Sequence, residues 1–209
     1  RWVIARYFAM FNSSRRDRWV FGDRDSGRYL VKFSWTRIVR HQMVTGGRVS
    51  GNWIHGDFPS CSTQGITSYD GGTVGVTIED NVVDIPRAAG IEWYSDQDSI
   101  IRHNTFADGK CDFENACGII NLGAKPGEQV GSGTIIRDNV LGGISYPGGD
   151  PDQIFTAEHN LSRDAIPGAR NITGLPTYVG QAGRYSGYRL ARGSLGEDDA
   201  SDGTDSGIR

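Results

Sequence analysis

The sequence predicts an all-β solenoid, in which the chain winds through short strands that stack on their counterparts in successive repeats. Two observations carry this prediction: one short phrase recurs along the chain, and glycine is abundant while hydrophobic residues are few. The 209 residues include 30 glycines and only 37% hydrophobic residues, a balance that suits many short strands joined by turns. No apolar stripe of helical period is sustained, and a β-sandwich would not repeat one phrase in register.

The recurring phrase is an apolar strand that runs into an asparagine. Its copies include VTIEDNVV (76–83), SIIRHNTF (99–106) and TIIRDNVL (134–141). The residues three before and two after each asparagine are apolar, whereas the residue two before is polar, which is the pattern of a half-buried strand. The copies lie 21 to 35 residues apart, a variable spacing that is typical of a solenoid with inserted loops. The aligned asparagines are Asn52, Asn81, Asn104, Asn139 and, more weakly, Asn160.

Each of these asparagines is expected to stand at a turn between two strands. Asparagine tolerates the left-handed backbone that tight bends require. A buried amide can bond the backbone groups that the bend leaves unpaired, and it can bond its counterpart in the next repeat. We therefore interpret the asparagines as structural corner residues rather than as catalytic ones.

A second strand phrase lies between the asparagine copies. It occurs as QGITSYDG (64–71), AGIEWYSD (89–96) and CGIINLGA (117–124), each with a glycine before an isoleucine that we expect to be buried. Those isoleucines are Ile66, Ile91 and Ile119. Strand alternation then predicts two outward columns, which are Thr67–Glu92–Ile120 and Tyr69–Tyr94–Leu122.

Together, these phrases resemble the repeats of right-handed parallel β-helix proteins of the pectin-lyase-like superfamily. The resemblance covers residues 45–165, and the closing stretch 187–208 is similar to the tail that follows the last coil in secreted bacterial members. It implies a single-stranded right-handed parallel β-helix over residues 1–165, a capping segment and acidic tail over 166–209, and a secreted or cell-surface location. The fold hosts lyases, hydrolases, epimerases, adhesins and phage tailspikes, so it does not select one activity.

The expected partner is a polysaccharide, which the protein would bind or would degrade as a lyase or glycoside hydrolase. Stacked Tyr69 and Tyr94 would form a platform on which sugars pack. Asp70, Glu92 and Asp96 lie beside them and would supply the carboxylate pair of a glycosidase. A solvated face with ordinary cross-strand pairs is the alternative interpretation, and it corresponds to a non-enzymatic structural or adhesive module.

Three histidine and aspartate residues add further candidates. His55 and Asp57 lie in NWIHGDFPS (52–60), where many members of the resembled family carry a His/Asp-rich segment, although Gln64 replaces the aspartate of the usual Asp-Gly-Ile. His103 is expected to stack between Asp80 and Asp138. It would serve as a proton-transfer or substrate-binding group, or as one step of an electrostatic ladder, and we favour the ladder.

The remaining features limit cofactors and partners. The acidic run 197–205 makes calcium the one cofactor that the sequence suggests, although the EF-hand register fails at Ala200 and Arg209. Cys111 and Cys117 bracket a loop that a disulfide could close, with free thiols as the alternative. The formal charge of −3 argues against a nucleic-acid partner, and no apolar run reaches the ~18 residues of a membrane helix. The chain opens without a methionine, and we expect a fragment or a processed form.

Overall fold

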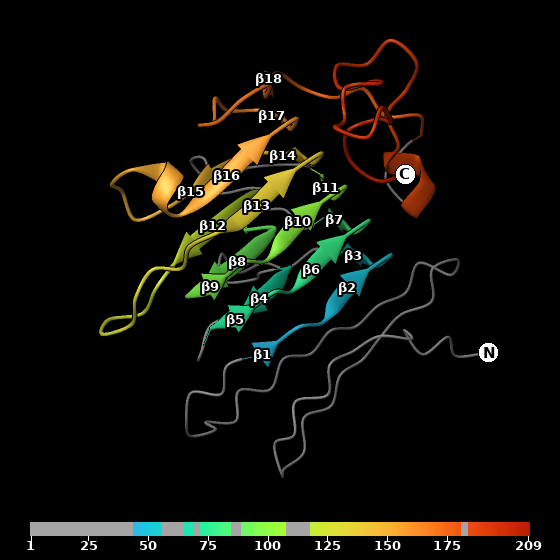
Figure 1. Ribbon diagram of the computed structural model, residues 1–209. Helices are drawn as coiled ribbons and strands as arrows, with labels where there is room; N and C mark the ends of the chain where they lie inside the picture. The colour runs from blue at the N-terminus through green and yellow to red at the C-terminus, as the bar shows by residue number, and fades with distance from the viewer. Residues whose placement is uncertain (1–43, 56–64, 69–71, 85–88, 108–117, 181–183) are drawn as a thin grey trace, which may run out of the picture.

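The computed structural model describes residues 44–55, 65–68, 72–84, 89–107, 118–180 and 184–209. Within these ranges the protein is mostly β, with eighteen short strands and two single turns of 3₁₀ helix, η1 (Pro151–Gln153) and η2 (Tyr185–Tyr188). The strands form four sheets, and every pair of neighbouring strands in them is parallel (Figure 1). The predicted all-β class and the parallel pairing of the recurring strands are confirmed.

Each sheet is named here by its number of strands. The five-stranded sheet has the order β16 (Phe155–Glu158), β13 (Thr134–Arg137), β10 (Ile100–Arg102), β6 (Thr77–Glu79) and β2 (Arg48–Ser50). The six-stranded sheet has the order β18 (Ile172–Thr173), β17 (Leu161–Ser162), β14 (Val140–Leu141), β11 (Thr105–Phe106), β7 (Val82–Asp84) and β3 (Trp53–His55). The four-stranded sheet has the order β15 (Gly143–Ser145), β12 (Ile119–Gly123), β8 (Ile91–Tyr94) and β4 (Ile66–Ser68). The three-stranded sheet has the order β1 (Val44–Thr45), β5 (Thr73–Val74) and β9 (Asp96–Gln97).

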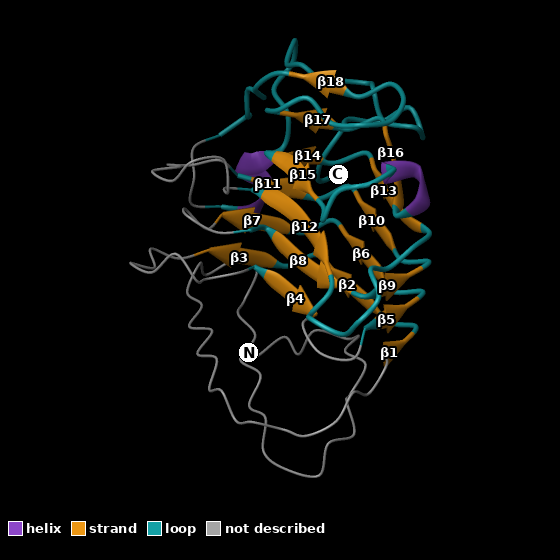
Figure 2. Ribbon diagram, turned by 90° about the vertical axis from the view of Figure 1, so that its left-hand side faces the viewer, coloured by secondary structure: helices purple, strands orange, loops and turns teal. Residues whose placement is uncertain are grey.

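The chain visits these sheets in turn, and each of the first three described repeats adds one strand to each of them, whereas later repeats add strands to fewer sheets. Strands β5 to β8, for example, belong to four different sheets, and β9 to β12 follow in the same sheet order. Strands of successive repeats therefore lie one above another, as Figure 2 shows for β4, β8 and β12. A side chain on one strand consequently meets the equivalent side chain of the next repeat, about 4.8 Å away.

The core is built from the apolar columns that the recurring phrase predicts. Ile78, Ile101 and Ile136 are paired in register on β6, β10 and β13, and all three are fully buried. Val83 and Phe106, two residues after their asparagines, join the same core cluster from the six-stranded sheet. Burial of each isoleucine contributes about 1.5–3 kcal/mol of transfer free energy, so a stack of identical columns stabilises the repeats jointly.

The predicted register of β12 is wrong by one residue. Ile66 and Ile91 pair with Ile120, which is fully buried, whereas Ile119 is only half-buried. Two adjacent isoleucines leave the inward position of a strand undetermined by sequence alone. Pairing with β8 decides it, because Leu122 then joins Trp93 in the core.

The asparagines form a continuous hydrogen-bonded ladder at the corner between the five-stranded and six-stranded sheets. Each side-chain amide donates to the side-chain oxygen of the next asparagine, at 2.9–3.0 Å, and each oxygen also accepts the backbone N–H of the preceding asparagine. The predicted role as corner residues is confirmed, and the ladder extends one step further, to Asn171. The residues that precede the asparagines have positive φ: Gly51, Asp80, His103, Asp138, His159 and Arg170.

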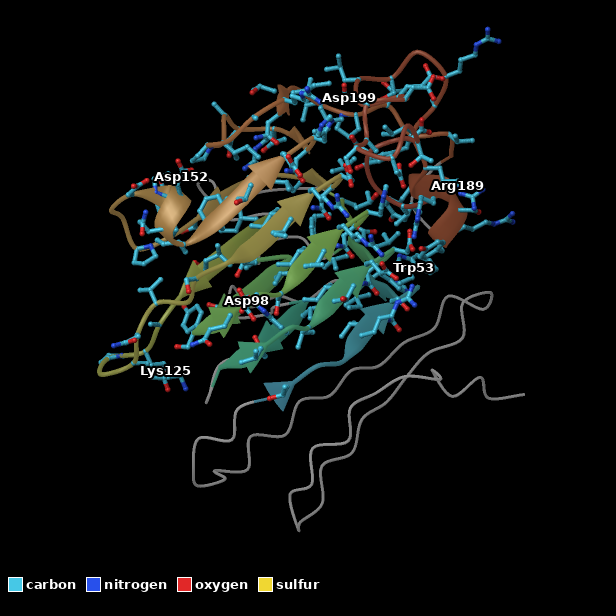
Figure 3. The ribbon with its side chains drawn as sticks, viewed as in Figure 1. Trp53, Asp98, Lys125, Asp152, Arg189 and Asp199 are labelled. Atoms are coloured by element: carbon cyan, nitrogen blue, oxygen red, sulfur yellow. The ribbon has the colours of Figure 1, made fainter. Side chains whose placement is uncertain are left out.

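Residues 184–209, called the C-terminal strap from here on, pack along the outward face of the six-stranded sheet. Tyr185, Tyr188 and Ile208 form one buried cluster with Trp53 and Val82. Leu190 packs on Val140 and Leu161 of the same sheet. Figure 3 shows Trp53 next to the strap, close to Arg189. Much of the predicted capping segment and tail therefore covers a side of the stacked strands rather than extending freely.

In the part of the chain that the structure describes, no helix has the length and apolar character that crossing a membrane requires.

Candidate functional site

A row of polar side chains crosses the outward face of the four-stranded sheet. Ile91 and Trp93 point into the core, so the alternating residues Glu92 and Tyr94 point outward. The residues in register with Glu92 on the neighbouring strands are Thr67 and Asn121, and Ser145 follows Asn121. The predicted column contained Ile120 in place of Asn121. Alternation counted back from Leu122 would have identified Asn121 correctly.

Glu92 is the most unusual member of this row. Its side chain faces outward, yet the residue is only 6% exposed. One carboxylate oxygen, Oε1, accepts hydrogen bonds from the Tyr94 hydroxyl at 3.1 Å and from the Asn121 amide at 3.2 Å. The other oxygen, Oε2, is buried and has no hydrogen-bond partner among the described residues. A buried polar atom without a partner is costly, so each one calls for an explanation, such as strain, an ordered water or a functional role.

The outward acid of the five-stranded sheet provides a useful contrast. Glu79 is fully buried, but it forms ion pairs with Arg102, at 2.7 Å, and with Arg48. Arg102 is the residue in register with Glu79 on β10, so this ion pair joins two successive repeats. In the described residues, Glu92 has no such ion pair. Its Oε1 is bonded to the hydroxyl and the amide beside it, whereas its Oε2 has no bond within the described residues.

Tyr94 supplies an aromatic surface beside this carboxylate. Gly123 is its partner in register on β12, and a Cβ atom at Gly123 would lie 2.9 Å from a ring carbon of Tyr94. The ring therefore lies over the next repeat, in space that only glycine leaves open. A phenol ring next to a carboxylate and an amide combines an apolar face with hydrogen-bonding groups.

The prediction that Asp96 lies on this outward face is wrong. Asp96 is 2% exposed, and its carboxylate accepts hydrogen bonds from the hydroxyls of Thr73, Ser99 and Thr134, the latter two at 2.6 Å. Ser95 has a positive φ, which turns the chain between β8 and β9 and reverses the side to which the next residue points. Asp96 consequently ties three repeats together inside the protein, and it does not form a carboxylate pair with Glu92.

The other predicted residues lie elsewhere or cannot be placed. Tyr69, Asp70 and Asp57 lie outside the described residues, as do all three cysteines. His55 ends β3 on the six-stranded sheet, where its ring stacks on Trp53 with a centroid separation of 4.1 Å and an interplanar angle of 18°. It therefore belongs to a different sheet from Glu92.

His103 lies under the C-terminal strap. It is 1% exposed, and its Nε2 is 3.7 Å from Asp138 and 3.2 Å from Asp202. The expected neighbour Asp138 is confirmed. The strap residue Asp202 was missed because nothing in the sequence indicates that the tail returns to this corner. Asp80, the second expected neighbour, instead pairs with Arg209 at 2.6 Å.

The acidic run of the tail does not assemble a metal site. No group of three or more histidine, cysteine, aspartate or glutamate side chains in the described residues has the arrangement that would hold a metal ion. Asp202 accepts hydrogen bonds from the hydroxyl and backbone N–H of Thr204, and Asp205 accepts one from the backbone N–H of Asp198. The hydroxyl bond from Thr204 is the largest cause that holds the pKa of Asp202 below its usual value. The Asp205 carboxylate therefore bonds within the tail itself, and that of Asp202 bonds within the tail and also faces His103.

Comparison with known proteins adds no family assignment, since no protein-family model, curated protein or solved structure matches this chain.

Proposed function

We propose that the chain is an extracellular polysaccharide-binding protein with a right-handed parallel β-helix fold like that of the pectin-lyase superfamily. The proposed binding surface is the outward face of the four-stranded sheet, around Glu92, Tyr94 and Asn121. The observation that carries the proposal is the free, buried Oε2 of Glu92 next to an aromatic ring on an outward face. This combination supplies both kinds of contact that sugar rings need.

The chemistry of the row suits sugar hydroxyls. A carboxylate oxygen accepts bonds from hydroxyls, an amide both donates and accepts, and the Thr67 and Ser145 hydroxyls do the same. The Tyr94 ring offers a face for the C–H groups of a sugar. Because the row runs along the stacking direction of the strands, a glycan chain laid along it would meet one polar side chain per repeat.

The charge at this face favours a neutral glycan over a uronate polymer. A uronate carboxylate placed near Glu92 would require the burial of two like charges, which is unfavourable without a cation. Among the described residues, no arginine or lysine forms an ion pair with Glu92, in contrast to Glu79. We therefore assign the site to neutral sugar units.

Binding is proposed in preference to cleavage because of Asp96. A glycosidase needs a second carboxylate at about 5–9.5 Å from the first. Asp96 is already bonded to three hydroxyls in the interior, and it is unavailable for that role. Cleavage by a pair of Glu92 and Asp70 is the second candidate function, and the same experiment tests it.

The experiment measures binding of the intact protein to a panel of neutral and uronate-containing polysaccharides by calorimetry, with reducing ends and unsaturated products followed in parallel. Glu92→Gln removes the charge with little change in shape, and loss of a charged hydrogen bond predicts about 10- to 100-fold weaker binding. Glu158→Gln, the same change at an outward position of the five-stranded sheet, is the matched control and should bind as the parent does. Equal affinities for the parent and Glu92→Gln, or no binding by any polysaccharide, would refute the proposal. Release of reducing ends would establish the second candidate instead.

A further inference from the structure

The C-terminal strap crosses the stacked strands at a buried histidine. His103 occupies the turn between β10 and β11, and the strap closes over it with Asp202 on one side and Gly207 on the other. The other charged groups around this corner are Asp138 and Asp80, from the equivalent turns of two neighbouring repeats, and Arg209, from the end of the strap. Arg137 also lies 3.7 Å from Asp138.

The groups that face the two ring nitrogens of His103 are all hydrogen-bond acceptors. Its Nδ1 lies 3.2 Å from the backbone oxygen of Gly207, and its Nε2 faces carboxylate oxygens of Asp202 and Asp138. A carbonyl and a carboxylate have no hydrogen to donate, so a ring with hydrogen on both nitrogens is the form that suits all of these contacts. In the neutral ring one nitrogen carries no hydrogen. Its lone pair would face the lone pair of another buried acceptor, which is unfavourable.

The equivalent histidine of a later repeat has the opposite surroundings. His159 also lies at a corner with positive φ, and its Nδ1 is 2.8 Å from the backbone oxygen of Asp199. Its Nε2, however, is 3.5 Å from the guanidinium of Arg170, which can only donate. A neutral ring with hydrogen on Nδ1 satisfies both contacts. The strap therefore touches both of these histidines, and of the two only His103 has acceptors facing both ring nitrogens.

We propose that the C-terminal strap acts as a proton-operated latch. It packs tightly on the turn between β10 and β11 when His103 is charged, and it packs more loosely when His103 loses its proton. This inference does not depend on the proposed glycan site, which lies on another sheet. The apolar contacts of Tyr185, Tyr188 and Leu190 hold the first part of the strap independently of this charge. The part that loosens is the loop around Asp202 and the Gly207–Ile208 segment, whose backbone N–H groups donate to Asp138 and Thr105.

The direction of the pH effect follows from the charges of Asp202 and His103. The pKa of Asp202 is lowered, mainly by its bond from the Thr204 hydroxyl and with further help from His103 and Arg209. Asp202 therefore keeps its charge to a pH below its usual titration range, and its contribution disappears only as the pH falls through the lowered pKa. Histidine side chains change charge between about pH 5 and 8. The latch is thus tightest in mildly acidic solution and loosens as the pH rises through the histidine range.

The test follows amide hydrogen exchange of Gly207 and Ile208 in the intact protein from pH 5.5 to 8, with each rate divided by the rate of an unstructured peptide at the same pH. In the parent, protection should fall by at least about tenfold as His103 loses its proton, since a charged hydrogen bond is lost. His103→Asn should abolish this pH dependence, because asparagine tolerates the positive φ but carries no charge. His159→Asn is the matched control and should keep it.

Two further measurements test the proposed latch if His103→Asn does not fold. Asp202→Asn changes an exposed carboxylate of the strap and should flatten the pH dependence of protection. The ¹⁵N shifts of the His103 ring should show both nitrogens protonated at the pH where protection is greatest. A neutral His103 ring at that pH would overturn the proposal. So would an Asp202→Asn variant whose amide protection depends on pH as strongly as that of the parent.

Discussion

Asn104→Ala offers the sharpest test of how the stacked repeats are held together. Asn104 is fully buried in the middle of the ladder. Its amide donates to Asn139 Oδ1 at 3.0 Å and to the backbone oxygens of Ile78 and Arg102, both at 2.9 Å. Its oxygen accepts from the backbone N–H and the side-chain amide of Asn81, at 3.1 and 2.9 Å. One side chain therefore connects three successive repeats.

The expected loss can be worked out from these contacts. The Asn104 amide has two hydrogens for its three acceptors, so about four hydrogen bonds are lost in total. One of the groups left behind is the buried backbone N–H of Asn81, for which no other bond within the described residues is recorded. A typical net value is about 1 kcal/mol per bond, and an unsatisfied buried group costs about 1–3 kcal/mol. Because some of the carbonyl groups keep other partners, we expect a loss of about 3–5 kcal/mol in the free energy of unfolding, and a fall in Tm of roughly 6–20 °C.

The matched control is Asn52→Ala, at the first described step of the same ladder. Asn52 is half-buried, and it donates to Asn81 Oδ1 and to the backbone oxygen of Ser50. Its loss should cost about 1 kcal/mol, because Asn81 Oδ1 keeps the bond from the backbone N–H of Asn52 and Ser50 is only half-buried. Urea unfolding followed by circular dichroism gives both free energies. Equal losses for the two variants would show that the ladder does not couple the repeats in the way that the hydrogen bonds indicate.

Two further substitutions separate the structural residues from the proposed binding residues. Gly123→Ala places a Cβ atom 2.9 Å from the Tyr94 ring, so it should displace that ring and weaken glycan binding severalfold, while Tm stays within a few degrees of the parent value. Calorimetry measures the binding and thermal unfolding measures Tm. Unchanged binding would disprove the role of the ring. Asp96→Ala removes the acceptor of three buried hydroxyls, so it should lower the free energy of unfolding by about 3–5 kcal/mol. The affinity of the folded protein for glycan should not change. A loss of affinity with an unchanged free energy of unfolding would instead place Asp96 in the binding site.

The sequence predicted those parts of the fold in which a single residue type marks each repeat. The asparagine column and the isoleucines three positions before it follow one strict pattern, and the structure places both as expected. The pattern failed where it became ambiguous. Two adjacent isoleucines hid the inward position of β12, and the positive φ of Ser95, which turns Asp96 inward, has no signature in a serine. Long-range contacts such as that between His103 and Asp202 depend on where the tail returns, which local patterns do not encode.

The sequence carries a signal for the position of the C-terminal strap in the residues that follow the asparagines. The residues that directly follow the asparagines face outward on the six-stranded sheet, yet most of them are apolar. They are Trp53, Val82, Thr105, Val140, Leu161 and Ile172. An outward column of this kind requires a cover, because exposed apolar side chains in register would create a large hydrophobic patch. The strap is that cover.

The same reasoning distinguishes the three larger sheets from one another. The outward column of the six-stranded sheet is apolar and is covered by the chain itself. The outward acid of the five-stranded sheet is neutralised by arginines from neighbouring repeats. The outward column of the four-stranded sheet is polar, and Glu92 in it keeps a buried oxygen without a partner among the described residues. Buried polar atoms without a hydrogen-bond partner among the described residues also occur on the other two sheets, at Arg137 Nε and Ser162 Oγ. The choice of the four-stranded sheet for the proposed ligand therefore rests on the Glu92 carboxylate together with the Tyr94 ring and the Asn121 amide beside it.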